Sequence, residues 1–218
     1  MNEEDMFTSP DYQKCALIII DFQHDCILPG AAFEVAGSYA VLSKIQQLAE
    51  TARKHQVPII HVVRAYLADG SNVDSCRRKL VQDGQKLFLP YTSGADFPTE
   101  LKPQDAPLLD WNALIAGDFQ QIGSSDWVMY KSRWGAFYQT ELEGFLNEQG
   151  IDTLIFAGCN FPNCPRTSMY EASERDFRIV LAKDAMSGVY EKGLQELANI
   201  AVTIMDTDEV CAHLATKA

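Results

Sequence analysis

The chain has 218 residues, 47% of them hydrophobic and 22% charged, a composition typical of a folded globular protein rather than a disordered one. Its net charge of −12 disfavours binding to nucleic acid, because an acidic surface repels the phosphate backbone. The sequence shows neither a signal-peptide pattern nor an apolar run long enough to span a membrane, so we expect a cytoplasmic protein without a membrane partner.

The first 63 residues predict two buried strands with a helix between them. Cys15–Asp21 (CALIIID) is a continuous apolar run ending in a carboxylate, which is typical of a strand in a parallel sheet. Apolar residues at helical spacing predict a helix over Ser38–His55, with Ser38 as its candidate N-cap. Val57–Val63 is the second predicted strand.

The pattern weakens over residues 64–126, where turn-forming residues dominate. Leu108–Phe119 is compatible with a helix or a hairpin. A stretch of this length without regular structure usually has a function of its own. We expect a long loop-rich insertion, of which residues 66–107 form either a lid or a subunit contact, and the sequence leaves both open.

The second half of the chain alternates between strands and helices. The predicted strands are Trp127–Tyr130, Thr153–Ala157, Arg178–Ala182 and Ala201–Met205, and the predicted helices are Ala136–Glu148, Arg166–Arg175 and Tyr190–Asn199. This alternation predicts one α/β domain over residues 1–218, a three-layer α/β/α sandwich with a mostly parallel central sheet.

Three residues with reactive side chains come at or just beyond the ends of predicted strands. Asp21 ends the first strand, Lys131 follows Trp127–Tyr130, and Cys164 lies beyond Thr153–Ala157. The carboxyl ends of parallel strands meet at one edge of the sheet, and ligands bind outside that edge. We therefore expect a carboxylate, an ammonium and a thiol to share one cleft.

Cys164 is the candidate nucleophile. Pro165 directly after it favours the first turn of a helix, where a proline loses no hydrogen bond. The positive end of that helix and a nearby Lys131 would favour a thiolate, and free N–H groups in the preceding turn would stabilise an oxyanion. The residues alone leave two interpretations open for Cys164, a nucleophile or a buried structural cysteine, and two for Asp21, a general base or a turn cap.

Three segments in this order resemble the isochorismatase-like cysteine hydrolase superfamily, which includes nicotinamidases and carbamoylsarcosine-type and ureidoacrylate-type amidohydrolases. The segments are LIIIDFQHDC, YKSRWGAFYQTEL, and GCNFPNCPRTS followed by YEASERDFRIVLAKDAMS. Together they cover about Cys15 to Ser187. The string GCNFPNCPRT is similar to the streptothricin-hydrolase-like branch, whose members open a cyclic amide.

The resemblance implies a role for each of the matching residues. Asp21 would be the acid/base, Lys131 the charge partner and Cys164 the nucleophile. The family has a non-proline cis peptide that would fall at Cys159–Asn160, and it would aim the N–H groups of Asn160 and Cys164 at the oxyanion. The sequence departs from the family at Phe161-Pro162, where a proline removes one possible N–H donor.

We expect neither a metal nor another cofactor. Nicotinamidases carry an aspartate and several histidines after the second strand, and these bind a metal. Here that region reads HVVRAYLADGSNVD, and His61 is its single histidine. The other histidines, His24, His55 and His213, lack ligand spacing.

The remaining site predictions concern the substrate pocket. Four aromatic residues next to the candidate catalytic segments are expected to line it: Phe22, Trp134, Phe137 and Phe161. Arg133 and Arg166 are candidates for binding a substrate carboxylate or are simply solvated. The six cysteines show no paired spacing, which agrees with reduced thiols, and the resemblance implies a homo-oligomer, a dimer or a tetramer.

These observations predict a hydrolase that cleaves a C–N bond of a small amide, lactam or carbamoyl compound through a thioester on Cys164. One alternative is vinyl-ether hydrolysis of the isochorismatase type, which needs the acid but not the thiol. A second alternative is a catalytically inactive binding module. The reactivity of Cys164 toward iodoacetamide distinguishes an activated thiol from both alternatives.

Overall fold

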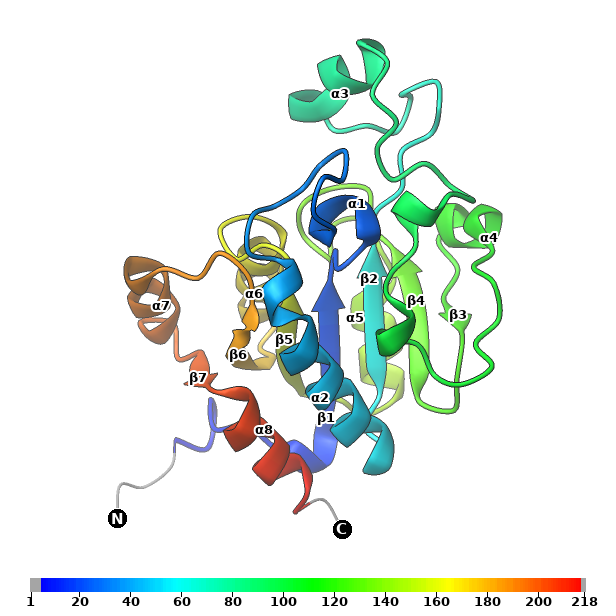
Figure 1. The fold of residues 1–218 in the computed structure, drawn as a ribbon. Coiled ribbons are helices and arrows are strands. Elements are labelled where there is room, and N and C mark those ends of the chain that lie inside the picture. Colours follow the sequence, from blue (N-terminus) through cyan, green and yellow to red (C-terminus); the bar gives the residue numbers. More distant parts are fainter. Residues whose placement is uncertain (1–4, 217–218) are drawn as a thin grey trace.

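The structure is a computed structural model that describes residues 5–216, and its centre is a seven-stranded sheet (Figure 1). The strands are β1 (Cys15–Ile20), β2 (Ile59–Val63), β3 (Gln120–Gln121), β4 (Asp126–Tyr130), β5 (Thr153–Gly158), β6 (Arg178–Met186) and β7 (Thr203–Met205). Their order across the sheet is β3-β4-β2-β1-β5-β6-β7, and all neighbours are parallel except β3 and β4. The prediction of a mostly parallel sheet is confirmed.

Helices cover both faces of the sheet. They are α1 (His24–Ile27), α2 (Leu42–Lys54), α3 (Ser75–Gln82), α4 (Trp111–Ala116), α5 (Leu142–Glu148), α6 (Cys164–Ser173), α7 (Glu191–Ala198) and α8 (Thr207–Leu214). Short 3-10 turns lie at Tyr12–Lys14, Tyr39–Val41, Ser93–Ala95 and Thr99–Leu101. In Figure 1, α2 and α8 lie in front of the sheet, whereas α5 and α6 lie behind it. The three-layer α/β/α sandwich is therefore confirmed.

Strand β1 lies in the middle of the sheet, and all six of its residues are buried. Leu17 and Ile19 pack into one hydrophobic core with α2 and α8, whereas Ile18 and Ile20 pack into the other with α5 and α6. Side chains alternate between the two faces of a strand, so a strand covered on both faces needs an unbroken apolar run. Burying each of these side chains stabilises the fold by about 1.5–3 kcal/mol.

The carboxyl ends of the central strands form one edge of the sheet, and backbone hydrogen bonds continue past them. The N–H of Asp21 donates to the carbonyl of Val62 at 2.9 Å, and the N–H of Lys131 donates to Val63 at 3.0 Å. In Figure 1 the arrows of β1, β2 and β4 point to the same edge, toward α1 and the segment that carries α3. This ladder fixes the starting points of the residues that follow each strand.

The predicted helix Ala136–Glu148 is wrong in its first half, because α5 begins at Leu142. The backbone N–H groups of Ala136 and Phe137 donate to Ser168 Oγ and Glu171 Oε2 on α6 instead of forming a helix. Gln139 then takes a positive φ of 52°, which a right-handed helix excludes. Tertiary contacts with α6 thus override the local pattern.

Ser38 is not the cap of α2, and this prediction is also wrong. A 3-10 turn over Tyr39–Val41 precedes α2, which starts at Leu42. The Ser38 hydroxyl is buried and lies 2.9 Å from Ser187 Oγ and 3.1 Å from Cys159 Sγ. Its side chain therefore joins the turn after β5 to the end of β6.

Residues 64–126 contain α3, α4, β3 and two of the 3-10 turns. Helix α4 realises the helical alternative for Leu108–Phe119: the Asp110 side chain accepts from the N–H groups of Asn112 and Ala113, and Gly117 ends the helix with φ of 108°. Helix α3 stands away from the sheet, at the top of Figure 1.

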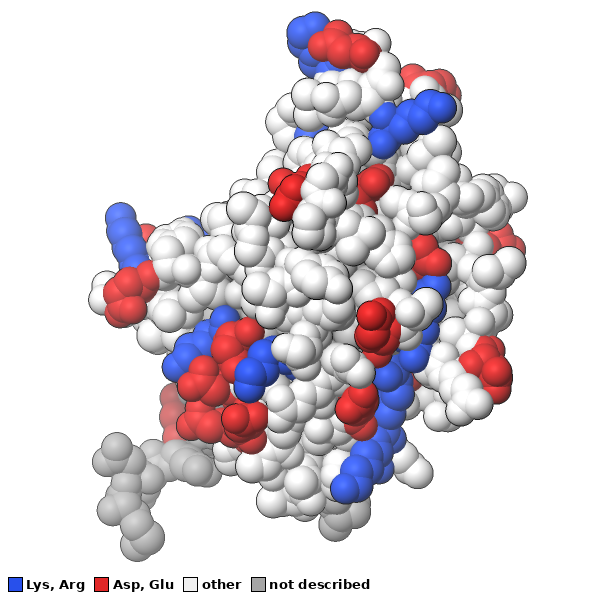
Figure 2. All heavy atoms as spheres, viewed as in Figure 1, with Lys and Arg blue, Asp and Glu red and all other residues white. Residues whose placement is uncertain are grey.

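Charged side chains of both signs are spread over the surface (Figure 2). On the face shown in Figure 2, acidic and basic side chains lie interspersed, with wide neutral areas between them. Among the helices of residues 5–216, none combines the length and the apolar character needed to cross a lipid bilayer.

Candidate active site

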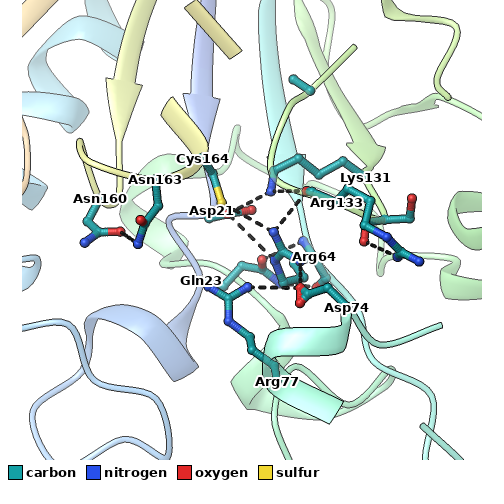
Figure 3. A network of polar contacts seen from close by, with 12 residues as sticks. Asp21, Gln23, Arg64, Asp74, Arg77, Lys131, Arg133, Asn160, Asn163 and Cys164 are labelled. Carbon is teal, nitrogen blue, oxygen red and sulfur yellow. Dashed lines mark hydrogen bonds and ion pairs between the residues drawn. The ribbon is translucent and has the colours of Figure 1, made fainter. Parts of the chain in front are cut away.

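The structure brings Asp21, Lys131 and Cys164 together at the carboxyl edge of the sheet (Figure 3). Asp21 follows β1, Lys131 follows β4, and Cys164 is the first residue of α6, after β5. Lys131 Nζ donates to Asp21 Oδ2 at 2.9 Å. The three residues are 4%, 0% and 3% exposed, so an acid, a cation and a thiol share a buried site.

Asp21 is held in its charged form. Burial by itself would raise the pKa of its carboxyl, but the charges of Lys131 and Arg64, with the hydrogen bond from Lys131, hold that pKa below its usual range. Of the two carboxylate oxygens of Asp21, Oδ2 accepts the hydrogen bond from the Lys131 ammonium. The other oxygen, Oδ1, is buried and accepts no hydrogen bond with good geometry from any residue between 5 and 216. This oxygen is free to take a proton.

The pKa of the Cys164 thiol is shifted upward, although Lys131 lowers it, as the sequence predicts. Burial raises the pKa of this thiol and the negative charge of Asp21 raises it further, while Lys131 and Arg64 offset part of the rise. Both directions favour a proton on the sulfur of Cys164 and a negative charge on Asp21. Ionising Cys164 requires a proton transfer, and Asp21 is the adjacent acceptor.

Arg64 is a member of the site that the sequence reasoning missed. Its Nη2 donates to Cys164 Sγ at 3.3 Å, and its Nη1 donates to Asp74 Oδ2 at 2.9 Å. Its Nε lies 3.9 Å from Asp21 Oδ2. Arg64 follows β2 directly, so the signal that identified Asp21 and Lys131, a polar residue after an apolar strand, applied to it as well.

Gln23 fixes the backbone of Arg64 and was also missed. Gln23 Nε2 donates to the carbonyl of Arg64 at 2.8 Å, and the N–H of Arg64 donates to Gln23 Oε1 at 2.7 Å. The Gln23 side chain is fully buried. This pair of hydrogen bonds keeps the guanidinium of Arg64 in position beside the thiol.

The turn between β5 and α6 presents backbone donors to the same site. The peptide bond between Cys159 and Asn160 is cis. Phe161 and Asn163 use their N–H groups in bonds to Ser187 and to Asn160. The backbone N–H groups of Asn160 and Cys164 donate to no backbone carbonyl or side chain of residues 5–216. They remain available for an oxyanion.

Beside the thiol lies a cavity of about 10 Å³, room for about one water molecule. It is lined by Asp21, Cys26, Phe33, Val35, Arg64, Arg77, Phe88, Cys159, Asn160 and Cys164. Two of these lining residues, Phe33 and Phe88, are aromatic and come from loops. A substrate can enter only when part of this lining moves.

None of the four aromatic residues expected in the substrate pocket lines this small cavity. Phe22, Phe137 and Phe161 are buried in the two hydrophobic cores. Trp134 lies in a neighbouring surface depression with Tyr138.

Arg133 and Arg166, the candidate carboxylate ligands, have partners within the protein. Arg133 Nη1 donates to the carbonyls of Asn72 and Ser132. Arg166 pairs with Glu196 and donates to the Tyr190 hydroxyl. Neither arginine lines the cavity beside Cys164.

The donor set after β2 does not fit a metal of the nicotinamidase kind. His61 is buried within β2, stacks on Phe97, and directs Nε2 to Asp126 at 3.3 Å. Beside the thiol, the same segment presents the guanidinium of Arg64, which repels a cation. Within residues 5–216, no group of three or more metal-ligating side chains of His, Cys, Asp or Glu is gathered.

A larger cavity, about 680 Å³, lies far from these residues. Its lining includes Phe7, Asp152 and Arg178, which belong to the N-terminal segment and to the starts of β5 and β6. Its size alone would favour this larger cavity as the substrate site. However, no cysteine lines it, and it lies at the edge of the sheet opposite to the one where ligands bind in parallel sheets. We therefore assign the chemistry to the smaller cavity.

Comparisons with known proteins agree on one family. The isochorismatase domain matches residues 15–209. A solved isochorismatase family protein from Desulfovibrio vulgaris superposes with a TM-score of 0.79 at 32% identity, over 93% of this chain and 98% of that one. A probable inactive nicotinamidase from Arabidopsis thaliana is 27% identical over 94% of this chain and 98% of its own length. N-carbamoylsarcosine amidase from Arthrobacter is 28% identical over 91% of this chain and 70% of its own length. The chain therefore belongs to the isochorismatase family.

Proposed function

We propose that this protein is a cysteine amidohydrolase that cleaves a C–N bond of a small amide through a thioester on Cys164. The observation that carries the proposal is the unoccupied Oδ1 of Asp21 in the cavity that the buried thiol of Cys164 also lines. A carboxylate in this position is suited to be the general base of a nucleophilic cysteine. The similarity to N-carbamoylsarcosine amidase supports an amide as substrate.

In the first step Asp21 takes the proton of Cys164 while sulfur forms a bond to the carbonyl carbon. The pKa of the Cys164 thiol is raised and that of Asp21 is lowered, so this transfer is uphill and accompanies the attack. Arg64 and Lys131 stabilise the developing thiolate charge. The carbonyl oxygen becomes an oxyanion, for which the N–H groups of Asn160 and Cys164 are the available donors.

In the second step the C–N bond breaks and the leaving nitrogen takes the proton from Asp21, which leaves a thioester and a free amine or ammonia. Water then attacks the thioester carbon, and Asp21 accepts a proton from it. The C–S bond breaks, a carboxylic acid leaves, and the proton returns to Cys164. Asp21 thus serves as base and acid in each half of the cycle.

Two observations bear on the alternatives from the sequence. Vinyl-ether hydrolysis needs no thiol. Here Arg64 donates directly to the sulfur of Cys164, which supports a reaction that uses this thiol. The Arabidopsis relative is described as a probable inactive nicotinamidase, which bears on the alternative of an inactive binding module. In this chain the carboxylate, the ammonium and the thiol are all present in one buried site, which favours an active enzyme.

The test is a panel of primary amides, lactams and ureides assayed for release of ammonia or amine. The Cys164→Ser variant should lose at least about 10³-fold in kcat/KM, because a hydroxyl without a stronger base cannot replace the thiol. Cys211→Ser is the matched control, since Cys211 lies on α8, away from the cavity. Full activity of Cys164→Ser would contradict the proposal and favour an ether hydrolase.

A further inference from the structure

Arg77 is a buried cation that the mechanism above does not use. It is the one buried residue of α3, the helix that stands away from the sheet. Its side chain is 10% exposed and lines the cavity that also contains Cys164 and Asn160. Figure 3 shows Arg77 reaching from α3 toward the cluster around Asp74.

The guanidinium of Arg77 is held rigidly. Its Cζ lies 4.8 Å from the ring centre of Phe33 and 4.7 Å from that of Trp134. Its Nη1 donates to Tyr66 Oη at 3.1 Å and to Asp74 Oδ2 at 3.3 Å. Aromatic stacking and two fixed acceptors reduce the entropy that the side chain would lose on binding a ligand.

Half of the guanidinium has no partner in the protein. Among residues 5–216, no group accepts a hydrogen bond from Nε or Nη2 of Arg77. Arg64, the neighbouring cation, is different: its Nη1 donates to Tyr66 and Asp74, and its Nη2 donates to Arg133 and Cys164. Of the two arginines that line the cavity, Arg77 is therefore the one whose Nη2 has no acceptor within residues 5–216.

The charges of the buried cluster do not cancel. Arg64, Arg77 and Lys131 are three cations, whereas Asp21 and Asp74 are two carboxylates and the Cys164 thiol is neutral. An excess positive charge in a buried site is unfavourable unless an anion balances it. The cavity thus favours a ligand with one negative charge, although the whole chain carries −12.

We propose that Arg77 binds a carboxylate of the substrate, so that the substrate class is an amide bearing a carboxylate, such as a half-amide of a dicarboxylic acid. The inference rests on the proposed function: the amide carbon faces Cys164 while the carboxylate accepts hydrogen bonds from Nε and Nη2 of Arg77. A guanidinium edge of this kind matches the two oxygens of a carboxylate. Since the cavity is about 10 Å³, Phe33 or Phe88 moves aside when the substrate enters.

The test compares half-amides with neutral diamides of the same length: oxamate with oxamide, malonamate with malonamide, and succinamate with succinamide. The wild-type protein should hydrolyse the best half-amide at least about 30-fold more efficiently, in kcat/KM, than its diamide. The Arg77→Met variant should lose most of that preference, mainly through KM for the half-amide.

Two variants separate substrate binding from support of the fold. Arg77→Lys retains the charge and should restore part of the preference, which a purely structural role would not produce. Arg78→Met removes the same charge from the next, exposed residue of α3 and should change neither substrate's kinetics. A parallel loss on both substrates in Arg77→Met, or a wild-type protein that favours the diamides, would overturn the inference.

A binding measurement keeps the inference distinct from the proposed function. In the Cys164→Ala background, calorimetry should detect succinate but not succinamide, and Arg77→Met should abolish the succinate signal. If the wild-type protein hydrolyses no amide but succinate binds through Arg77, the proposed function fails and the carboxylate site stands. If amides are hydrolysed but no dicarboxylate of two to four carbons binds, the proposed function is kept and the carboxylate site at Arg77 is refuted.

Discussion

Lys131 Nζ lies 2.9 Å from Oδ2 of Asp21, and the same carboxylate keeps Oδ1 free beside the thiol of Cys164. The two oxygens of the Asp21 carboxylate therefore have different roles. One holds a permanent ion pair that keeps the carboxylate charged, and the other is the acceptor for a proton. The chemistry proposed for the site follows from this division.

Replacing Lys131 with Met should destabilise the protein and inactivate it. Removing one partner of a buried ion pair typically costs about 3–5 kcal/mol, because the other charge stays buried. Chemical denaturation should show this loss together with a fall in kcat of about 10² or more. Lys79→Met breaks an exposed pair with Asp83 and should change neither quantity. Unaltered stability of Lys131→Met would refute the role of the pair.

Replacing Arg64 with Gln should slow the alkylation of Cys164 by iodoacetamide. The charge of Arg64 lowers the pKa of the thiol, so its loss leaves less thiolate at neutral pH. Amide hydrolysis should fall by about 10² or more, as for loss of a transition-state donor. Arg53→Gln is the control, because Arg53 pairs with Asp126 outside the cavity. Equal labelling rates in Arg64→Gln and the wild-type protein would contradict this role.

Replacing Gly158 with Ala should damage the core beneath the site. Gly158 has φ of 126°, and an added Cβ would lie 2.3 Å from the carbonyl oxygen of Ile20 in the neighbouring strand. Strain and overlap together should cost about 2–4 kcal/mol. Gly150→Ala shares the positive φ, 67°, but its Cβ would meet nothing within 4 Å, so it should lose only about 1 kcal/mol. Equal losses in denaturant would mean that the close approach is unimportant.

His61 should make the stability fall as the pH drops below 6.5. Burial lowers the pKa of His61 from 6.5, although Asp126 opposes the shift. Between these two pKa values the unfolded chain binds a proton at His61 and the folded protein does not. The contribution of His61 to the free energy of unfolding is therefore fully present above pH 6.5, and it is lost as the pH falls toward the lowered pKa. The slope is at most about 1.4 kcal/mol per pH unit. His61→Gln should flatten this part of the curve. A slope that persists in His61→Gln would exclude His61 as its source.

The sequence predicted two of the three site residues that directly follow strands, Asp21 and Lys131, and missed the third, Arg64. Asp21 and Lys131 each end an unbroken apolar run, and a parallel sheet gathers such ends at one edge. Helix α8 was not predicted, although Asp206 and Glu209 form the capping box that precedes it. That signal is local and was available in the sequence.

Other features depend on contacts between distant segments and carry no local signal. The cavity aromatics Phe33 and Phe88 come from loops without periodicity. Arg77 looks like a surface residue of a charged helix, and only its contacts with Tyr66 and the distant Trp134 bury it. Substrate recognition is therefore harder to predict than the nucleophile, because it depends on loop conformation.

The rate at which iodoacetamide alkylates Cys164 in the Asp21→Asn variant, measured by peptide mass spectrometry at pH 7 beside amide hydrolysis, tests the role of Asp21 as proton acceptor. The negative charge of Asp21 raises the pKa of the thiol, so its removal should accelerate alkylation even as hydrolysis falls by at least about 10³-fold. Alkylation as slow as in the wild-type protein, or slower, would contradict a resting thiol beside a charged carboxylate. So would hydrolysis that survives the loss of that carboxylate.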